Sequence, residues 1–280
     1  MSLIDYLPSP GSGSIHIGPL QLRAYGLMIA LGVIAAARIA SRRMVRTGIG
    51  DSDQMTSIAV WAVPAGVVGS RLYHVATEWE RFSDRLADIP KIWQGGLGIP
   101  GGILAGTLVG VWRARRLGIA IPPLLWAVAP AIPVAQAIGR LGNWFNQELF
   151  GRPTGLPWGL RVDADKVADA GYAPGTLFHP TFLYESLWNL GLAATLVWIG
   201  WRWIAPTSAR PARLFALYVT GYGIGRFWVE GLRIDPAKSG GGLRLNQWTA
   251  IVLIVGGLAY LAYSRIKPEK EEPVGLVDES

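Results

Sequence analysis

The sequence predicts an all-α integral membrane protein with seven transmembrane helices and a small extracytoplasmic head segment. Hydrophobic residues make up 51% of its 280 residues and the mean hydropathy is +0.31, more apolar than an ordinary soluble domain. Apolar runs recur along the chain, each close to the roughly 20 residues that a helix needs to cross a bilayer. Several of the 13 Trp lie near the ends of these runs, where an indole can keep its N–H in water. These observations exclude a soluble fold.

Seven segments are apolar enough to be spans, and we expect them to form a single membrane domain covering residues 1–280. The third span is the shortest. The segment before the first span, Met1–Pro19, lacks the basic region and adjoining apolar core of a cleavable signal, so we expect the first span to be retained. The predicted spans are 19–40, 55–76, 97–113, 120–139, 181–201, 212–230 and 246–265.

Basic residues gather at alternate ends of these spans. Cytoplasmic loops of membrane proteins carry an excess of Lys and Arg, so the pattern predicts an outside N-terminus and a cytoplasmic tail at 267–280. The loops at the opposite ends mix acidic and basic residues and should face outward. The net charge of +7 is therefore attributed to orientation and anionic lipid, and no nucleic acid partner is expected. The clusters are Arg42, Arg43 and Arg46; Arg113, Arg115 and Arg116; Arg202, Arg210 and Arg213; and Arg265, Lys267 and Lys270.

In the first span, Arg23 and Tyr25 lie near the outer end, where both are typical interfacial anchors. The third span places four glycines at intervals of four, which predicts a ridge for close helix packing. Its first part, Gly95–Gly102, contains too many helix breakers for a regular helix. Two interpretations stay open there: irregular backbone that lines a cavity, or a loop that enters a packed helix. The four glycines are Gly98, Gly102, Gly106 and Gly110.

The fourth span should kink at Pro130 and Pro133 and end in a polar stripe. If the helix continues, four polar residues at i, i+4, i+7 and i+11 share one face. An ionisable group at membrane depth usually marks a site, and a guanidinium fork matches phosphate oxygens. The alternative is an Arg that reaches the interface and an Asn that caps the helix. The stripe consists of Gln136, Arg140, Asn143 and Gln147.

The segment 140–179 is rich in Pro, Gly and Trp, and we expect it to form an outward-facing head with fixed turns. His179 or Thr181 should cap the start of the fifth span, and a structural hydrogen bond is the alternative for His179. Glu185 should be buried one turn into that span, and a buried carboxylate requires a partner, which we expect to be an Arg from another span.

The sixth span carries a second basic face. Tyr222, Arg226, Glu230 and Arg233 follow i, i+4, i+8 and i+11. An ion pair within the helix is the simpler explanation, but we expect it to satisfy only one of the two arginines. Two Arg-bearing faces at the outer half of the membrane favour an anionic lipid headgroup as ligand.

Several kinds of chemistry have no support in the sequence. The chain has no Cys, so a disulfide, a thiolate metal site or a Cys nucleophile is excluded. No motif of a zinc protease, a serine hydrolase or a nucleotide-binding loop is present, and neither a metal nor a cofactor is expected. The residues alone predict an outward-facing phospholipid site.

Five motifs carry a resemblance to a known family. The most specific is G-R-L-G-N-W-F-N-Q-E-L-F-G-R-P-T at Gly139–Thr154, supported by matches at Ala24–Gly26, Gly95–Gly102, His179–Glu185 and Gly221–Glu230. Over nearly its full length the chain resembles the bacterial phosphatidylglycerol–prolipoprotein diacylglyceryl transferases. The resemblance implies an enzyme of the bacterial cytoplasmic membrane that acts on the extracytoplasmic side. It would move the diacylglyceryl group of phosphatidylglycerol to the lipobox Cys thiol of a prolipoprotein signal peptide and release glycerol phosphate.

The resemblance also implies roles for particular residues. Arg140 and Arg226 would be catalytic, and nine further residues would bind substrate or support the site. Where many family members carry a His that is a candidate thiol base, this chain has Pro100, and Phe182 replaces a common Gln. A phospholipid transporter or flippase is the alternative, although the chain halves show no self-similarity, and a structural membrane protein is a third. The nine residues are Tyr25, Asn143, Asn146, Glu148, Gly151, His179, Tyr222, Glu230 and Arg233.

Overall fold

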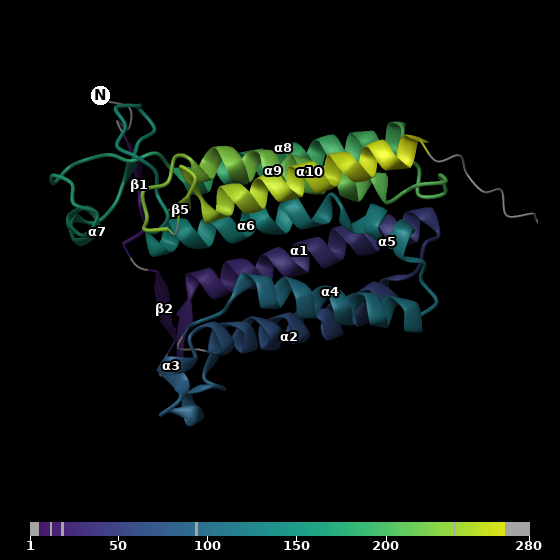
Figure 1. Cartoon of the computed structure of the whole chain (residues 1–280), viewed down its shortest axis with the longest axis horizontal. Helices are drawn as coiled ribbons and strands as arrows, with labels where there is room; N and C mark the ends of the chain where they lie inside the picture. The colour runs from purple at the N-terminus through teal and green to yellow at the C-terminus, as the bar shows by residue number, and fades with distance from the viewer. Residues whose placement is uncertain (1–5, 12, 18–19, 93–94, 238, 267–280) are drawn as a thin grey trace, which may run out of the picture.

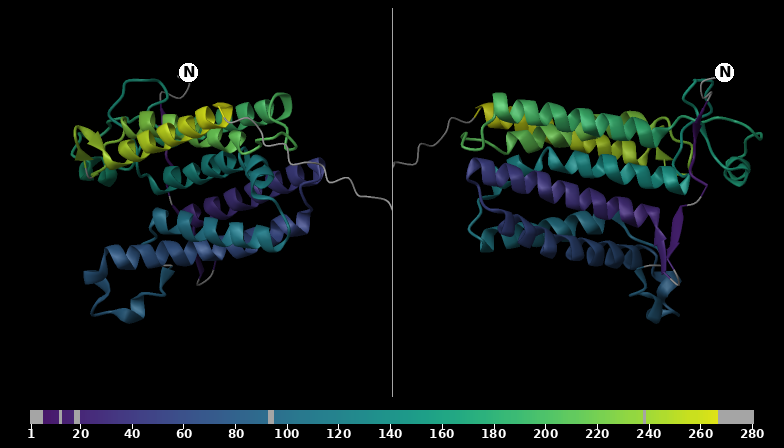
Figure 2. Two further views of the ribbon diagram at one scale, coloured as in Figure 1. Left: turned by 45° about the vertical axis from the view of Figure 1, so that its right-hand side comes forward. Right: turned by 180° about the vertical axis from the view of Figure 1, so that it is seen from behind.

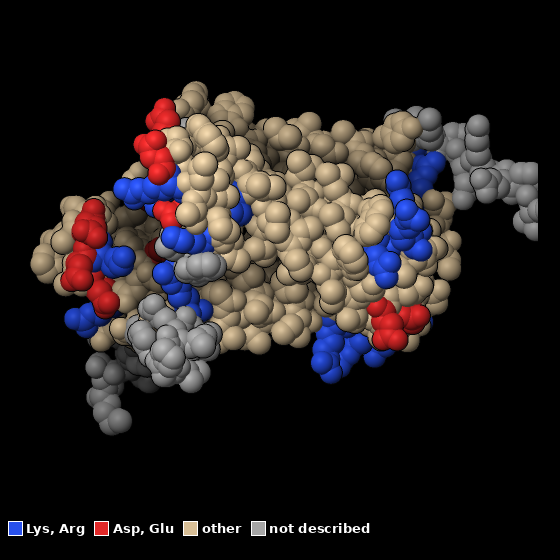
Figure 3. All heavy atoms as spheres, turned by 90° about the horizontal axis from the view of Figure 1, so that it is seen from below, with Lys and Arg blue, Asp and Glu red and all other residues tan. Residues whose placement is uncertain are grey.

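The computed structural model describes residues 6–11, 13–17, 20–92, 95–237 and 239–266, and this part of the chain is mostly helical. The long helices run side by side along one axis (Figure 1, Figure 2). On the face shown in Figure 3, acidic and basic side chains gather at the two ends and leave an uncharged band between them. Such a band suits a hydrocarbon core. The apolar helices therefore indicate a multi-pass membrane protein.

Among the described residues, four helices are long and apolar enough to cross a bilayer, and a bent pair makes a fifth candidate. Two more helices lie in the bundle, but each carries three charged residues. The first of these packs along α2 and the second along α10. The four helices are α1 (Ala24–Thr47), α2 (Ser52–Thr77), α8 (Thr181–Arg202) and α10 (Leu245–Ile266); the pair is α5 (Ile121–Val128) with α6 (Ala131–Asn146); the two others are α4 (Ile99–Arg116) and α9 (Arg213–Glu230).

The first predicted span starts too early and stops too soon. Residues 20–23 form strand β3 (Leu20–Arg23), which pairs with β2 (Ser14–Ile17), so the helix begins only at Ala24. It then continues to Thr47, beyond the predicted end at residue 40. Arg43, beyond the predicted end, is a buried residue of this helix, and its guanidinium stacks 3.7 Å from the centre of the Trp126 ring. A cation that finds an aromatic face can be buried at low cost.

The glycine ridge of the third predicted span is present in α4. A Cβ atom on Gly102 would lie 3.2 Å from the Gly66 carbonyl oxygen of α2, and one on Gly106 would lie 3.2 Å from that of Ala62. The two backbones can approach this closely because glycine has no side chain. Both interpretations of Gly95–Gly102 hold in part: Gly95 and Gly96 are irregular backbone that lines a pocket beside Arg71 and His74, and the loop then enters α4 at Ile99.

The predicted kink in the fourth span is also present. A bend of 41° separates α5 from α6 at Pro130. The predicted polar stripe is wrong at its last member, because α6 ends at Asn146 and Gln147 takes the left-handed conformation, with φ of 52°. This turns Gln147 away, and its side-chain amide donates to the Pro10 carbonyl and to Asp163 instead.

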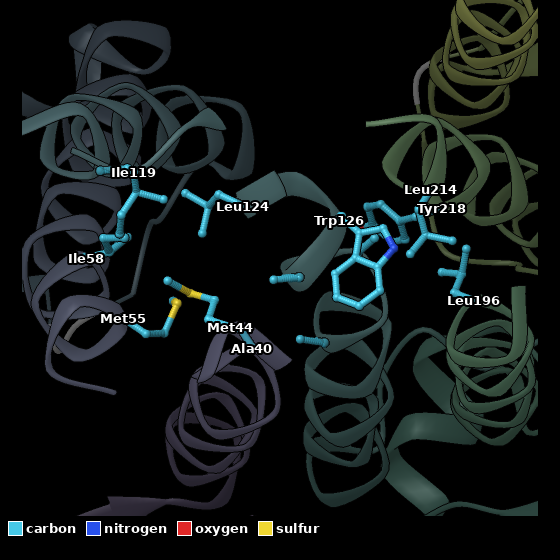
Figure 4. Close-up of a cluster of buried hydrophobic side chains, with 14 residues drawn as sticks. Ala40, Met44, Met55, Ile58, Ile119, Leu124, Trp126, Leu196, Leu214 and Tyr218 are labelled. Carbon is cyan, nitrogen blue, oxygen red and sulfur yellow. The ribbon is translucent and has the colours of Figure 1, made fainter. Parts of the chain in front are cut away.

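The largest hydrophobic core lies at the end of the bundle where α1 stops and α9 starts. In Figure 4, Met44 of α1 faces Met55 of α2, while Trp126 of α5 points toward Leu214 and Tyr218 of α9. Met44, Trp126 and Leu214 are fully buried. This apolar packing ties the helices together at one end and leaves the polar residues of α6, α8 and α9 to meet at the other.

Residues 147–180 fold at that other end around a small core of their own, built on Phe150, Leu160 and Phe178. This segment contains α7 (Ala164–Asp169), and its strand β4 (Leu160–Arg161) pairs with β1 (Leu7–Pro8). The predicted tail at 267–280 lies outside the described residues. The remaining short elements are α3 (Trp79–Phe82), the 3-10 helix η1 (Leu86–Asp88), and the hairpin of β5 (Ser239–Gly240) with β6 (Leu243–Arg244).

Candidate active site

Two arginines from different helices meet at one buried carboxylate. Glu185 of α8 is 7% exposed. One of its oxygens is paired with Nε of Arg140 on α6, and the other accepts a hydrogen bond of 3.1 Å from Nη1 of Arg226 on α9. The expected Arg partner of Glu185 is confirmed, and there are two. A buried carboxylate held between two guanidiniums is compensated and fixes the position of both.

A second carboxylate, fully buried, extends this cluster. Glu230 of α9 is 0% exposed and is paired with Nη2 of Arg226 at 2.8 Å and Nη1 of Arg233 at 3.3 Å. The simpler explanation of the basic face, ion pairs within the sixth span, therefore accounts for both Arg226 and Arg233. The expectation that it satisfies only one of them is wrong. A third guanidinium, that of Arg244 in β6, lies 2.7 Å from Glu230 through Nε.

Asp235 completes the cluster beyond the end of α9. Arg233 binds it through two nitrogens at 2.7 and 2.9 Å, and Nη2 of Arg244 lies 3.0 Å away. Burial alone would raise the pKa of Asp235, but the hydrogen bonds from Arg233 and the charges of Arg233 and Arg244 hold it below its usual range. Asp235 is therefore ionised at neutral pH.

Sequence reasoning missed Asp235 and Arg244. Both belong to the connection between the sixth and seventh predicted spans, outside every recognised motif, and only the β5–β6 hairpin returns Arg244 to Glu230. The sequence does contain a feature that could have indicated Arg244: it lies at the predicted outer end of the seventh span, whereas the four basic clusters lie at the predicted cytoplasmic ends.

A line of amides leads from Arg140 to the surface. Asn143, which is 3% exposed, accepts a 3.3 Å hydrogen bond from Arg140 and donates one of 2.8 Å to Glu148. Asn146 donates to the same Glu148 oxygen at 3.3 Å. Glu148 itself is exposed. The structure thus brings together these four residues of the Gly139–Thr154 motif.

Gly151 allows the chain to pass between two other site segments. Its backbone N–H donates to the His179 carbonyl at 2.9 Å, and it forms a β-bridge with Arg233. A Cβ atom at this position would lie 2.8 Å from Cβ of His179 and 3.1 Å from the Leu232 carbonyl oxygen. Any side chain here would push these segments apart.

His179 has a structural environment. Its Nδ1 lies 3.1 Å from the hydroxyl of Tyr184, which also accepts a hydrogen bond from Trp158. Burial, together with the positive charge of Arg152, lowers the pKa of His179 below its ordinary value. The imidazole is therefore neutral at pH 7, as expected for a residue that holds the start of α8 by hydrogen bonding.

The two tyrosines differ in their placement. Tyr25 packs against α6 beside Asn143, since a Cβ atom on Gly142 would lie 2.6 Å from its ring. Tyr222 packs on the hydrophobic core, 6.1 Å from the ring of Tyr218. Its hydroxyl makes no hydrogen bond to the Arg and Glu cluster within the described part of the chain, so the structure does not join it to that cluster.

The cluster keeps donors that could bind an anion. The side chains of Arg140 and Arg226 are 23% and 14% exposed. Neither Nη2 of Arg140 nor Nε of Arg226 donates a hydrogen bond to a described residue. The ion-paired groups number four guanidiniums and three carboxylates, so one positive charge is left over. The members are Arg140, Arg226, Arg233 and Arg244 with Glu185, Glu230 and Asp235.

Comparison with known proteins gives the family. The family model for prolipoprotein diacylglyceryl transferase matches residues 13–263. The chain belongs to the prolipoprotein diacylglyceryl transferase family. The resemblance carried by the five sequence motifs is thereby confirmed.

Relatives in this family are similar over most of the chain. A phosphatidylglycerol–prolipoprotein diacylglyceryl transferase 2 of Streptomyces coelicolor is 48% identical over 265 residues, which cover 93% of this chain and 81% of the relative. The enzyme of Streptomyces griseus is 47% identical, with 97% and 82% covered. That of Frankia alni is 46% identical, with 98% and 73% covered. All three carry the same activity in their names.

Proposed function

We propose that this chain transfers the diacylglyceryl group of phosphatidylglycerol to the lipobox Cys thiol of a prolipoprotein, forming a thioether and releasing glycerol phosphate. Membership of the prolipoprotein diacylglyceryl transferase family supports the reaction class. The observation that carries the assignment of the site is the convergence of Arg140 and Arg226 on Glu185, with unused N–H groups and one surplus positive charge. A phosphate is the anion that such a pair of forks suits best.

The reaction is a displacement at a glycerol carbon. The thiol loses its proton to solvent, the sulfur forms a bond to the glycerol carbon, and the bond from that carbon to the phosphate ester oxygen breaks. The electron pair leaves with glycerol phosphate. A few per cent of a free thiol is thiolate at neutral pH, and nearby guanidiniums increase this fraction by lowering the thiol pKa. The protein itself has no Cys, so the acceptor supplies the sulfur.

Arg140 and Arg226 stabilise the departing phosphate in this scheme. Nη2 of Arg140 and Nε of Arg226 are the nitrogens of these two side chains that contact neither Glu185, Asn143 nor Glu230. Because Glu185 holds both guanidiniums before substrate arrives, little reorganisation is needed as charge develops on the phosphate.

The other predicted residues support or border this centre. Asn143 orients Arg140 and is itself held by Glu148, while Asn146 holds Glu148. Glu230 and Arg233 fix Arg226 from the other side. Gly151 and His179 set the path of the chain beside Arg233, and Tyr25, which packs against Gly142 next to Asn143, would contact the lipid headgroup. Tyr222 supports α9 through the core.

The placement in the membrane completes the proposal. Seven spans result if α4 and α9 also cross the bilayer of the bacterial cytoplasmic membrane. The N-terminus and the segment 140–179 then lie outside and the tail 267–280 inside, so that lipid and signal peptide reach the site from the extracytoplasmic side. The four basic clusters support this orientation. Reporter fusions after four basic residues should report cytoplasm, and fusions near Asp84 and Asp165 should report the outside. An even number of spans would refute the scheme. The four residues are Arg46, Arg116, Arg213 and Lys270.

The activity is tested with purified protein, phosphatidylglycerol vesicles and a synthetic lipobox peptide, with the peptide mass as readout. We expect a mass gain of one diacylglyceryl group and stoichiometric release of glycerol phosphate. A peptide with Ser in place of Cys should stay unmodified, because an alcohol ionises far less than a thiol, whose pKa is about 8.5. An unmodified Cys peptide, with a well-folded protein and both substrates present, would refute the proposal.

A further inference from the structure

We propose that Arg244 and Asp235 are positioning residues, which fix the orientation of Arg226 through Glu230. The inference rests on the proposed role of Arg226 in phosphate departure. Neither residue is expected to touch the reacting atoms. Their contribution would be to hold the buried carboxylate that aims the catalytic guanidinium.

Arg244 uses all three of its nitrogens within the cluster. Nε binds Glu230 at 2.7 Å, Nη2 binds Asp235 at 3.0 Å, and Nη1 donates to the Arg233 carbonyl at 3.1 Å. These acceptors include the last residue of α9 and two residues just beyond it. One planar guanidinium therefore locks the end of the helix that carries Arg226.

The chain on both sides of Arg244 is itself tied down. Its backbone N–H donates to the Gln247 side chain at 3.0 Å, and Asn246 donates to the same Glu230 oxygen that Arg244 binds, at 3.2 Å. Trp248 closes the hairpin with a 2.9 Å hydrogen bond to the Gly240 carbonyl. Arg244 thus enters the cluster from a fixed β-hairpin and the first turn of α10, and not from a loose loop.

Asp235 keeps Arg233 and Arg244 in place together. Two of its contacts come from Arg233 and one from Arg244, so the carboxylate lies between the two guanidiniums. Without Asp235, Arg233 and Arg244 would have Glu230 as their only carboxylate partner among the described residues, and Arg226, which also binds Glu185, shares that carboxylate. The like charges of the guanidiniums would then repel one another. We expect the more exposed side chains to move first, which are Arg244 at 18% and Arg226 at 14% exposed.

The position of Arg226 depends on this arrangement. Nη2 of Arg226 is bonded to Glu230 and Nη1 to Glu185, which leaves Nε for the ligand. If Glu230 shifts, the guanidinium of Arg226 rotates, and its Nε–H is no longer directed at the position proposed for the phosphate. A misplacement of about 1 Å can cost roughly 100-fold in rate.

The test is a kinetic comparison of Arg244→Gln, Arg244→Lys and Asp235→Asn with wild type, in the lipobox-peptide assay and in detergent thermal unfolding. We expect kcat to fall roughly 10- to 100-fold in Arg244→Gln, with KM for phosphatidylglycerol within about threefold. Arg244→Lys should recover only part of the loss, since Lys keeps the charge but lacks the fork. The matched control is Arg161→Gln, an exposed arginine of β4 outside the cluster, which should keep normal kcat.

A double-mutant comparison separates positioning from mere structural support. Once Arg226→Lys has removed the guanidinium to be aimed, adding Arg244→Gln should lower kcat less than threefold further, because the two changes act on one element. If the two losses multiply, or if Arg244→Gln and Asp235→Asn keep wild-type kcat, the inference is wrong. Should Arg244→Gln fail to fold, Asp235→Asn and Arg244→Lys in the same two backgrounds decide. Failure of the proposed function would appear differently, as normal turnover in Arg226→Lys alone.

Discussion

Guanidiniums are buried at both ends of this helix bundle, but they are held in different ways. At the end where α6, α8 and α9 meet, Arg226 is fixed by two carboxylates, Glu185 and Glu230. At the other end, Arg43 lies over the ring of Trp126 and donates to the Trp126 carbonyl at 3.4 Å. The first arrangement fixes the direction of individual N–H groups. The second helps to join α1 to α5 but leaves the buried Nε of Arg43 without a hydrogen-bond partner among the described residues.

The comparison shows that a buried Arg is not in itself the mark of a site. A guanidinium that is fixed by carboxylates from separate helices, and that still has unused N–H groups, is prepared to receive an anion. A guanidinium stacked on an indole contributes to stability instead. Substitutions at the two ends should therefore affect different measurements.

The largest effect is expected from Arg140→Lys and Arg226→Lys. Lys retains the positive charge but cannot bind Glu185 and a phosphate at the same time through a planar fork. Loss of one fixed donor from a desolvated site costs about 3–4 kcal/mol, or roughly two to three orders of magnitude in kcat. The measurement is the initial rate of peptide modification at saturating lipid, with thermal unfolding to verify the fold.

Arg81→Lys provides the control for this experiment. Its side chain is 72% exposed and pairs only weakly with Glu78, at 3.8 Å. Turnover in this variant should equal that of wild type. Near-normal turnover in well-folded Arg140→Lys and Arg226→Lys would remove the distinction between the two ends, since charge alone would then suffice.

An intermediate effect, on stability only, is expected from Arg43→Ala. The change removes a buried cation–π contact, worth about 2 kcal/mol where the cation is desolvated. The melting temperature should fall while kcat of the surviving folded protein stays unchanged, because Arg43 lies at the end opposite the Arg140 and Arg226 cluster. The neighbouring exposed Arg42, changed to Ala, should alter stability by less than about 0.5 kcal/mol. A loss of kcat without loss of stability in Arg43→Ala would mean that the two ends are coupled.

The sequence was most informative where one physical rule dominates. Apolar length predicted where helices form, Pro130 predicted the bend, and the cost of an isolated buried carboxylate predicted an Arg partner for Glu185. Helical periodicity placed Arg140 and Asn143 on one face, and the two side chains are hydrogen-bonded.

Apolar length and helical periodicity gave wrong predictions where the local backbone conformation decides which way a side chain points. Gln147 leaves the predicted face because its own left-handed conformation ends α6, which no apolar pattern records. Arg244 reaches Glu230 through a hairpin closed by three successive glycines, 240–242, so its contact depends on a turn and not on a period. The start of the first helix differs from the prediction because pairing of β2 with β3 occupies residues 20–23, and its end at Thr47 is followed by Gly48 in the left-handed conformation, with φ of 68°.

The smallest effect on turnover is expected from His179→Gln and His74→Gln. His179 is bonded to Tyr184, and His74 lies against the Phe82 ring at 5.7 Å and near Glu78 at 3.9 Å. Because a lipobox thiol already ionises in part at neutral pH, we expect neither histidine to be indispensable as a proton acceptor. Turnover of both variants at pH 7 should stay within about threefold of wild type.

Measuring stability as a function of pH distinguishes a structural role of His179 from a role as acceptor of the thiol proton. Its pKa in the folded protein is lowered by burial and by Arg152, whereas in the unfolded chain it is close to 6.5. The unfolded state therefore binds more protons as the pH falls below about 6.5, and the stability of wild type should decline toward the lower folded-state pKa. In His179→Gln this part of the decline should be absent, while kcat is retained. If His179→Gln instead unfolds at the wild-type temperature throughout the titration and has lost turnover, His179 takes the thiol proton, and phosphate departure is no longer the only step that this site must promote.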